Sequence, residues 1–118
     1  MKDLNKKKLR NSIIYGIPDE LRGNIWKLLC KTKEIGKNHS PELYHRLISL
    51  KNEEDDFCIG KDLPRTLTYI KNCNKNPEEA RIKLYNVLKA YSSYDLEIGY
   101  CQGINYLAAM LLTHIKDE

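Results

Sequence analysis

Hydrophobic positions along the chain recur mostly at intervals of three and four residues, the spacing of one face of an α-helix. One such run follows Pro18-Asp19-Glu20, where a proline and two acids suit a first helical turn. No stretch alternates polar and apolar residues as a half-buried strand does, and β-branched residues do not cluster. The pattern therefore predicts an all-α fold, an irregular array of several helices.

Glycine, serine and asparagine mark where these helices are expected to begin and end. Gly36 and Asn38 should break the first helix, and Ser40 should cap the second. Asn76, followed by a proline, should cap a third. The charged, unperiodic run at residues 51–61 is expected to form a loop. The expected inward-facing positions are Leu21, Ile25, Leu28, Leu29, then Leu43, Leu47, Ile48 or Leu50, then Leu84, Val87, Leu88, Tyr91, Tyr94, and finally Ile104, Leu107, Ala108, Leu111, Leu112 and Ile115.

The last helix is apolar on more than one side, because Ala109 and Met110 add to its main stripe. A helix of this kind needs neighbours on several faces. The chain has 118 residues, which is the size of one domain or part of one. We therefore expect a piece of a larger helical domain.

Composition excludes several classes of protein. The chain is 42% hydrophobic and 31% charged, with a net charge of +4, part of which comes from the basic segment 1–15. That segment is most simply a solvated tail or helix face, with a weak phosphate or anionic-lipid contact as the alternative. Aromatic residues do not alternate with its lysines, so we expect no nucleic-acid partner. The uncharged run 98–115 is too polar for a transmembrane segment, and no secretory signal is present, so we expect a cytoplasmic protein.

The cysteines and histidines do not have the spacing of metal ligands. The four cysteines include no CxxC pair, and the three histidines include no HxxxH pair. Reduced, largely structural thiols and no metal are therefore expected. A cysteine hydrolase that uses Cys101 is disfavoured, because no histidine lies near it in the sequence.

Two polar clusters lie in the first two thirds of the chain. Arg22 and Trp26 are four residues apart, so on a helix the guanidinium can stack on the indole, which we interpret as a structural contact. Pro64 favours the first turn of a helix, so Arg65 is expected at a junction between a loop and a helix. Asp62 is close enough to hold Arg65 or to cap the turn. Taken alone, this pattern is most often a surface ion pair.

The third cluster, residues 99–105, directly precedes the most apolar helix. Gly99 and Gly103 bracket Gln102 and free the backbone around it from steric limits. Asn105 can hydrogen-bond the local backbone. Two interpretations stay open from these residues alone: polar caps of a helix, or side chains that act on a partner.

Together the three clusters resemble the motifs of the TBC domain, the helical GTPase-activating domain that acts on Rab proteins. Residues 16–23 with Trp26 match the RxxxW motif; Ile59, Asp62, Arg65 and Thr66 match IxxDxxRT; and residues 100–103 match the core of YxQG. Leu67-Thr68 departs from the usual Phe-Pro, and Ile104 from the usual Met. The resemblance therefore implies that residues 16–118 are the N-terminal part of a TBC domain, and we expect its C-terminal half to be absent.

The resemblance implies that Arg65 is an arginine finger and Gln102 a glutamine finger, both supplied in trans to a Rab-family GTPase. The residue types fit: arginine is a permanent planar cation, and a glutamine amide can both accept from a water and donate to a phosphate. The implied supporting residues are Asp62, Thr66, Tyr100, Gly103 and Asn105, with Arg22 and Trp26 as architecture.

By the same resemblance the chain is a GTPase activator without turnover of its own. It needs no cofactor, since GTP and Mg²⁺ belong to the partner. It would act in the cytoplasm, with peripheral association with endomembranes through the partner left open. The rival hypothesis is a TBC-like module that binds a GTPase or scaffold without activating it.

Overall fold

The computed structural model describes residues 6–70 and 76–115, and all regular structure within these ranges is helical. The helices are α1 (Lys6–Ile14), α2 (Asp19–Leu29), α3 (Thr32–Gly36), α4 (Leu43–Ser49), α5 (Glu53–Ile70), α6 (Pro77–Tyr94) and α7 (Ile104–His114). The predicted all-α fold is confirmed.

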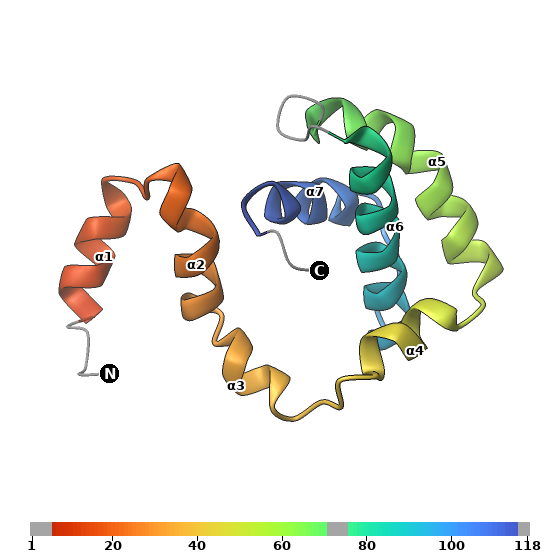
Figure 1. Cartoon of the computed structure of the whole chain (residues 1–118), viewed down its shortest axis with the longest axis horizontal. Helices are drawn as coiled ribbons and strands as arrows, with labels where there is room; N and C mark the ends of the chain where they lie inside the picture. Colours follow the sequence, from red (N-terminus) through yellow and green to blue (C-terminus); the bar gives the residue numbers. More distant parts are fainter. Residues whose placement is uncertain (1–5, 71–75, 116–118) are drawn as a thin grey trace.

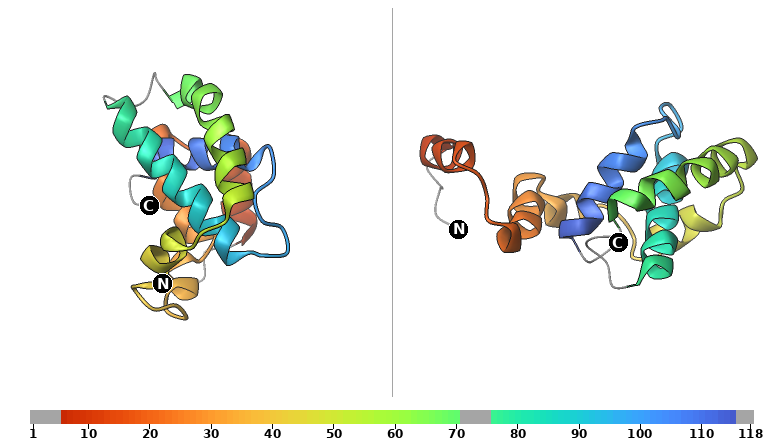
Figure 2. Two further views of the ribbon diagram at one scale, coloured as in Figure 1. Left: turned by 90° about the vertical axis from the view of Figure 1, so that its right-hand side faces the viewer. Right: turned by 90° about the horizontal axis from the view of Figure 1, so that it is seen from above.

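The helices form a compact body with an extended arm. α4, α5, α6 and α7 gather on one side, whereas α1, α2 and α3 lead towards them along an arc (Figure 1). Figure 2 shows α1 at the far end of this arm, away from α4–α7. The radius of gyration is 16.0 Å, against roughly 13–14 Å for a compact domain of this length. Apart from Gly23 of α2, the buried residues of the described helices lie on α5, α6 and α7.

The core lies where α5 packs against α6 and α7. Its fully buried members include Ile59 on α5, with Leu84 and Leu88 on α6. Ala108 and Ala109 of α7 are small, which allows α7 to approach closely. The predicted stripe on α6 is only partly right: Tyr91 and Tyr94 are exposed, and the helix buries Ala80, Lys89, Ala90, Ser92 and Ser93 along with its two leucines.

The predicted loop at residues 51–61 is wrong, because α5 begins at Glu53 and continues through Pro64. Its four acids, Glu53 to Asp56, occupy the first turn, where the helix dipole favours negative charge. Asn52 accepts a hydrogen bond from the Asp55 backbone N–H at 3.2 Å, as an N-cap does. Arg65 therefore projects from within a helix and not from a loop–helix junction.

Pro64 is tolerated because it is exposed and the rest of α5 is strongly packed. The buried positions of α5 are Ile59, Asp62, Leu63, Thr66 and Ile70, which follow the helical period. Two of the five are polar, so the stripe is hidden from a search for hydrophobic residues.

The other predicted boundaries have mixed outcomes. Asn76 caps α6, accepting from the Glu79 N–H at 3.3 Å, as predicted. Ser40 makes no side-chain cap, since α4 begins after Glu42. The first long helix ends earlier than predicted, at Leu29, because Lys31 adopts a left-handed conformation with φ 53°. The prediction of inward-facing positions is wrong for Leu21, Leu28 and Leu29, and for Leu50 as the alternative to Ile48, because all four are about half exposed.

α2 meets α7 through Gly23, which is buried. A Cβ at this position would lie 2.1 Å from the carbonyl oxygen of His114, so the approach of the two backbones requires glycine. Trp26 packs edge-on against the His114 ring, with centroids 5.1 Å apart, in place of the predicted stacking on Arg22. Arg22 instead donates from Nε to the Ile17 carbonyl at 3.0 Å and pairs with Asp19.

Candidate functional site

An open cleft of about 410 Å³ lies between α5 and the loop that precedes α7. Its lining residues are Cys58, Lys61, Asp62 and Arg65 from α5, with Tyr100 and Gln102 from the loop. Arg65 and Gln102, 37 positions apart in the sequence, thus face one cleft. The packing of α7 on α5 brings them together.

Asp62 is the central acceptor of this cleft and is only 8% exposed. Its Oδ1 pairs with the Arg65 guanidinium, one turn along α5. Its Oδ2 accepts a hydrogen bond from the Tyr100 hydroxyl at 2.6 Å. Burial and this hydrogen bond raise the pKa of Tyr100 above its usual range, which further favours the protonated hydroxyl that donates to Asp62. Asp62 therefore holds one side chain from each wall of the cleft.

A second set of hydrogen bonds runs behind the cleft. The Thr66 hydroxyl donates to the Asp62 carbonyl at 2.7 Å, and Asn105 Nδ2 donates to Thr66 Oγ1 at 2.7 Å. Asn105 Oδ1 accepts from the Gly103 N–H at 2.9 Å. Thr66 and Asn105 are both 0% exposed, so the two bonds made by the Thr66 hydroxyl are shielded from water. Together these hydrogen bonds tie the backbone beside Gln102 to the residue beside Arg65.

Gln102 itself is exposed, and within the described part of the chain its side chain makes no hydrogen bond. Gly103 occupies the N-cap position of α7 with φ +109°, a conformation that favours glycine, and no side chain caps this helix. Asn105, in the first turn of α7, accepts from the N–H of Gly103, so the hydrogen bond at this helix start does not involve the Gln102 side chain. Of the two interpretations of this loop, helix capping therefore does not account for Gln102.

Of the predicted site residues, the structure gathers seven and separates two. Asp62, Arg65, Tyr100 and Gln102 line the cleft, and Thr66, Gly103 and Asn105 lie directly behind it. Arg22 and Trp26 are not among its lining residues and belong to the contact of α2 with its neighbours.

Sequence reasoning missed the two remaining lining residues, Cys58 and Lys61, because it read their segment as a loop. Four- and seven-residue offsets from Arg65 place them on the same face of α5. Lys61 lies over the Phe57 ring, 5.4 Å from its centroid. Cys30, Cys58 and Cys101 are exposed, so the expectation of structural thiols is wrong for these three; Cys73 lies outside the described residues.

The cleft is lined by two cationic side chains, Arg65 and Lys61, and by one amide, Gln102. The Arg65 side chain is 48% exposed, and its guanidinium has further N–H donors beyond the one that meets Asp62. Gln102 offers both a donor and an acceptor. No three His, Cys, Asp or Glu side chains gather as a metal site in residues 6–70 and 76–115, and no helix there is long and apolar enough to cross a membrane.

Comparison with known proteins identifies the family. The sequence profile of the Rab-GTPase-TBC domain matches residues 19–118. The chain is 34% identical over 113 residues to the Rab GTPase-activating protein tbc-11 of Caenorhabditis elegans, and 37% identical over 113 residues to the GTPase-activating protein GYP5 of Eremothecium gossypii. It is 33% identical over 116 residues to the growth hormone-regulated TBC protein 1 of Xenopus laevis.

The chain therefore belongs to the Rab-GTPase-TBC domain family. Each of these alignments covers 94% of the chain, but only 12% of the worm and fungal proteins and 33% of the frog protein. A comparison with solved structures found no significant match.

Proposed function

We propose that this chain contributes the catalytic part of a Rab GTPase-activating domain, with Arg65 and Gln102 as the two residues that enter the active site of the GTPase. The observation that carries the proposal is that both side chains face one cleft, exposed at their tips and held from behind. Membership of the family and the activities named for its relatives supply the reaction class.

Arg65 would neutralise charge on the transferring phosphoryl group. Phosphoryl transfer needs little covalent help and depends on stabilising the charge spread over the phosphoryl oxygens. The guanidinium cannot lose its proton at neutral pH and can meet two oxygens at once. Asp62 would fix the direction of the side chain while leaving other N–H groups for the phosphate.

Gln102 would hold the attacking water. Its amide oxygen can accept from the water while its NH₂ donates to the γ-phosphate. A residue in this role must be accessible and must not be engaged by its own backbone, which is how Gln102 lies here. GTP and Mg²⁺ would come with the partner, so the activator needs no cofactor, and it would act at the membrane where that GTPase resides.

The proposal is tested by GTP hydrolysis. A panel of purified Rab proteins is mixed with the full-length protein that contains this chain, and phosphate release is measured with and without it. We expect at least one Rab to be stimulated strongly. Binding to a GTP-loaded Rab without any stimulation, across the whole panel, would instead indicate a non-catalytic binding module and overturn the proposal.

A further inference from the structure

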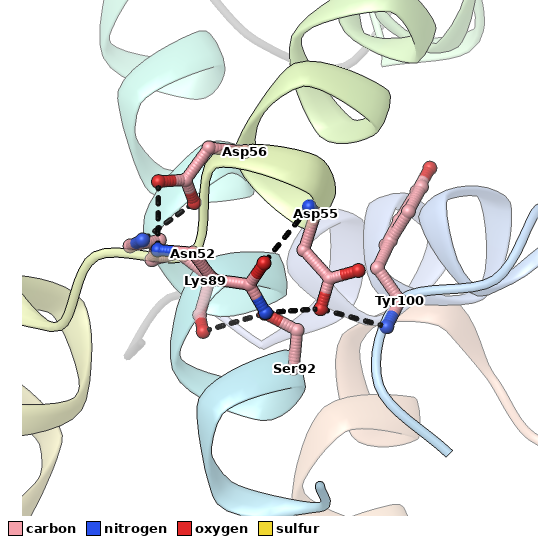
Figure 3. Close-up of polar contacts among 6 residues, drawn as sticks. All are labelled: Asn52, Asp55, Asp56, Lys89, Ser92 and Tyr100. Atoms are coloured by element: carbon pink, nitrogen blue, oxygen red, sulfur yellow. Dashed lines mark hydrogen bonds and ion pairs between the residues drawn. The ribbon is translucent and has the colours of Figure 1, made fainter.

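Asp55, in the first turn of α5, contacts the loop that carries Gln102 at two consecutive residues. Its Oδ2 accepts a hydrogen bond from the Tyr100 backbone N–H at 3.3 Å (Figure 3). Gly99 packs so closely that a Cβ there would lie 3.3 Å from the same oxygen. Asp55 belongs to none of the three motifs from which the proposed function was built.

The carboxylate of Asp55 is itself held in place. Asn52 Nδ2 donates to Asp55 Oδ2 at 3.0 Å, and Asn52 Oδ1 accepts from the Asp55 N–H at 3.2 Å. The neighbouring Asp56 accepts from the Asn52 N–H at 3.4 Å and pairs with Lys89 of α6, which is only 4% exposed. Figure 3 shows Asp55 between Asn52 and the Tyr100 backbone. The start of α5 is thus tied to α6 on one side and to the loop on the other.

Tyr100 is held at both of its ends by one face of α5. Asp55 accepts a hydrogen bond from the Tyr100 N–H, and Asp62 accepts one from the Tyr100 hydroxyl. These two acids are seven positions, or about two helical turns, apart. Beyond Gln102, Asn105 holds the Gly103 N–H. The backbone on each side of Gln102 therefore has its own anchor, and Asp55 is the anchor on the N-terminal side.

We propose that Asp55 is a positioning residue for Gln102, acting through the backbone of Gly99 and Tyr100. This rests on the proposed function, in which Gln102 enters the GTPase. Without Asp55, the hydrogen bond that remains between α5 and the N-terminal side of the loop, among the described residues, is that of the Tyr100 hydroxyl, at the end of a side chain whose ring packs against the core. A displacement of about 1 Å at a reacting group can reduce a rate by as much as about 100-fold.

The simpler role for Asp55 is that of an acid favouring the helix dipole at the start of α5. Glu54 is a matched control, because it lies in the same first turn, carries the same charge and is exposed. In the full-length protein, kcat and KM for stimulated GTP hydrolysis are measured together with thermal melts. Asp55→Ala should lower kcat by about 10- to 100-fold with little change in KM, whereas Glu54→Ala should leave both unchanged.

Two further variants keep the test decisive if Asp55→Ala folds poorly. Asp55→Asn retains an oxygen that can accept from Tyr100, so it should recover most of the stimulated rate. Gly99→Ala leaves Asp55 and Asn52 untouched but places a methyl against the carboxylate, at a residue with φ +60°, so it should lower kcat as Asp55→Ala does.

A double-variant cycle separates positioning from stability. If Asp55 acts only through Gln102, then Asp55→Ala combined with Gln102→Ala should be no slower than Gln102→Ala alone. Full kcat in Asp55→Ala, or equal loss of kcat and melting temperature in Asp55→Ala and Asp55→Asn, would overturn the inference. Full stimulation by Gln102→Ala would instead overturn the proposed function, so the two failures are distinguishable.

Discussion

Arg65 is held through its side chain, whereas Gln102 is held only through its backbone. Asp62 pairs with the Arg65 guanidinium, and Asn105 and Asp55 hold the residues on either side of Gln102. A guanidinium with five donors can keep one partner and still bind another group. An amide has fewer bonding positions, so a partner would need it unoccupied. The two residues therefore call for different tests.

For Arg65, charge alone should not be sufficient. Arg65→Lys keeps the positive charge but loses the planar arrangement of donors, so it should be nearly as damaging as Arg65→Ala. Both should lower the stimulated rate of GTP hydrolysis on the order of 10³-fold or more. Near-normal stimulation by Arg65→Ala in the full-length protein would show that the assignment is wrong.

For Gln102, we expect a substitution to change the stimulation of GTP hydrolysis without changing the stability of the fold. The side chain makes no hydrogen bond in the described part of the chain, so Gln102→Ala should leave the melting temperature nearly unchanged while abolishing stimulation. Loss of a cap would instead lower the free energy of unfolding by about 0.5–2 kcal/mol.

A partner variant sharpens this test. Under the proposed function, a Rab whose own catalytic glutamine has been replaced should still respond to the intact protein, because Gln102 would supply the amide in trans. If that Rab binds normally but is not stimulated, the glutamine role is excluded even where Arg65 proves essential.

At the scale of whole elements, α5 is the helix on which the site depends. It carries Asp55, Asp62, Arg65 and Thr66, and it packs on both α6 and α7. Its continuity through Pro64 fixes the spacing of these residues along one rigid axis. Had the chain turned at residue 60, the anchor at Asp55 and the anchor at Asp62 would not share a face.

The contact of α2 with α7 should be sensitive to size at Gly23. Gly23→Ala places a methyl against the His114 carbonyl, so α2 must move, and we expect a loss of about 1–3 kcal/mol in the free energy of unfolding. Gly36 is a matched control in a neighbouring helix, since a Cβ there meets nothing within 4 Å. Denaturant melts measure both; equal effects would contradict a specific contact.

Trp26 should contribute to the same contact. It is only partly buried, so Trp26→Ala should cost less than the roughly 3–5 kcal/mol of a fully buried aromatic. Any loss of activity should follow the loss of folded protein. An unchanged melting temperature with lost activity would instead indicate that Trp26 belongs to the functional site.

At the scale of the whole molecule, α7 is packed on one face and exposed on the other. Leu107, Met110 and Leu111 are 52%, 49% and 37% exposed. An apolar groove of about 400 Å³, lined on the α7 side by residues that include Leu107 and Leu111, runs between α7 and α6. Exposed apolar surface of this kind promotes association.

The 118-residue chain on its own should therefore self-associate, and size-exclusion chromatography at increasing concentration measures this. Leu107→Gln should reduce association without lowering the helix content seen by circular dichroism, because Leu107 is half exposed. A chain that stays monomeric at every concentration would contradict the prediction that the exposed apolar face of α7 drives association.

The sequence by itself determined the class of fold and most of the candidate site residues. Helical period and start signals such as Asn76 are local properties, so they can be read without knowing what packs where. The three motifs indicated Arg65, Gln102 and their neighbours as candidate site residues, because these residue types suit the stabilisation of a phosphoryl group and an attacking water. The family that they resembled is the family that the comparisons show.

The tertiary structure alone decided which residues face inward and which ones support the site. Lys89 and Ser92 are buried while Tyr91 is exposed, because Lys89 pairs with Asp56 of α5. Most of the run 51–61 is helical because its acids lie in the first turn of α5, where Asn52 accepts a hydrogen bond from the Asp55 N–H. The hydrogen bond from Tyr100 to Asp55 joins residues 45 positions apart. The burial of a side chain and its ion-pair or hydrogen-bond partners depend on which helices pack together, and local residue spacing does not predict that packing.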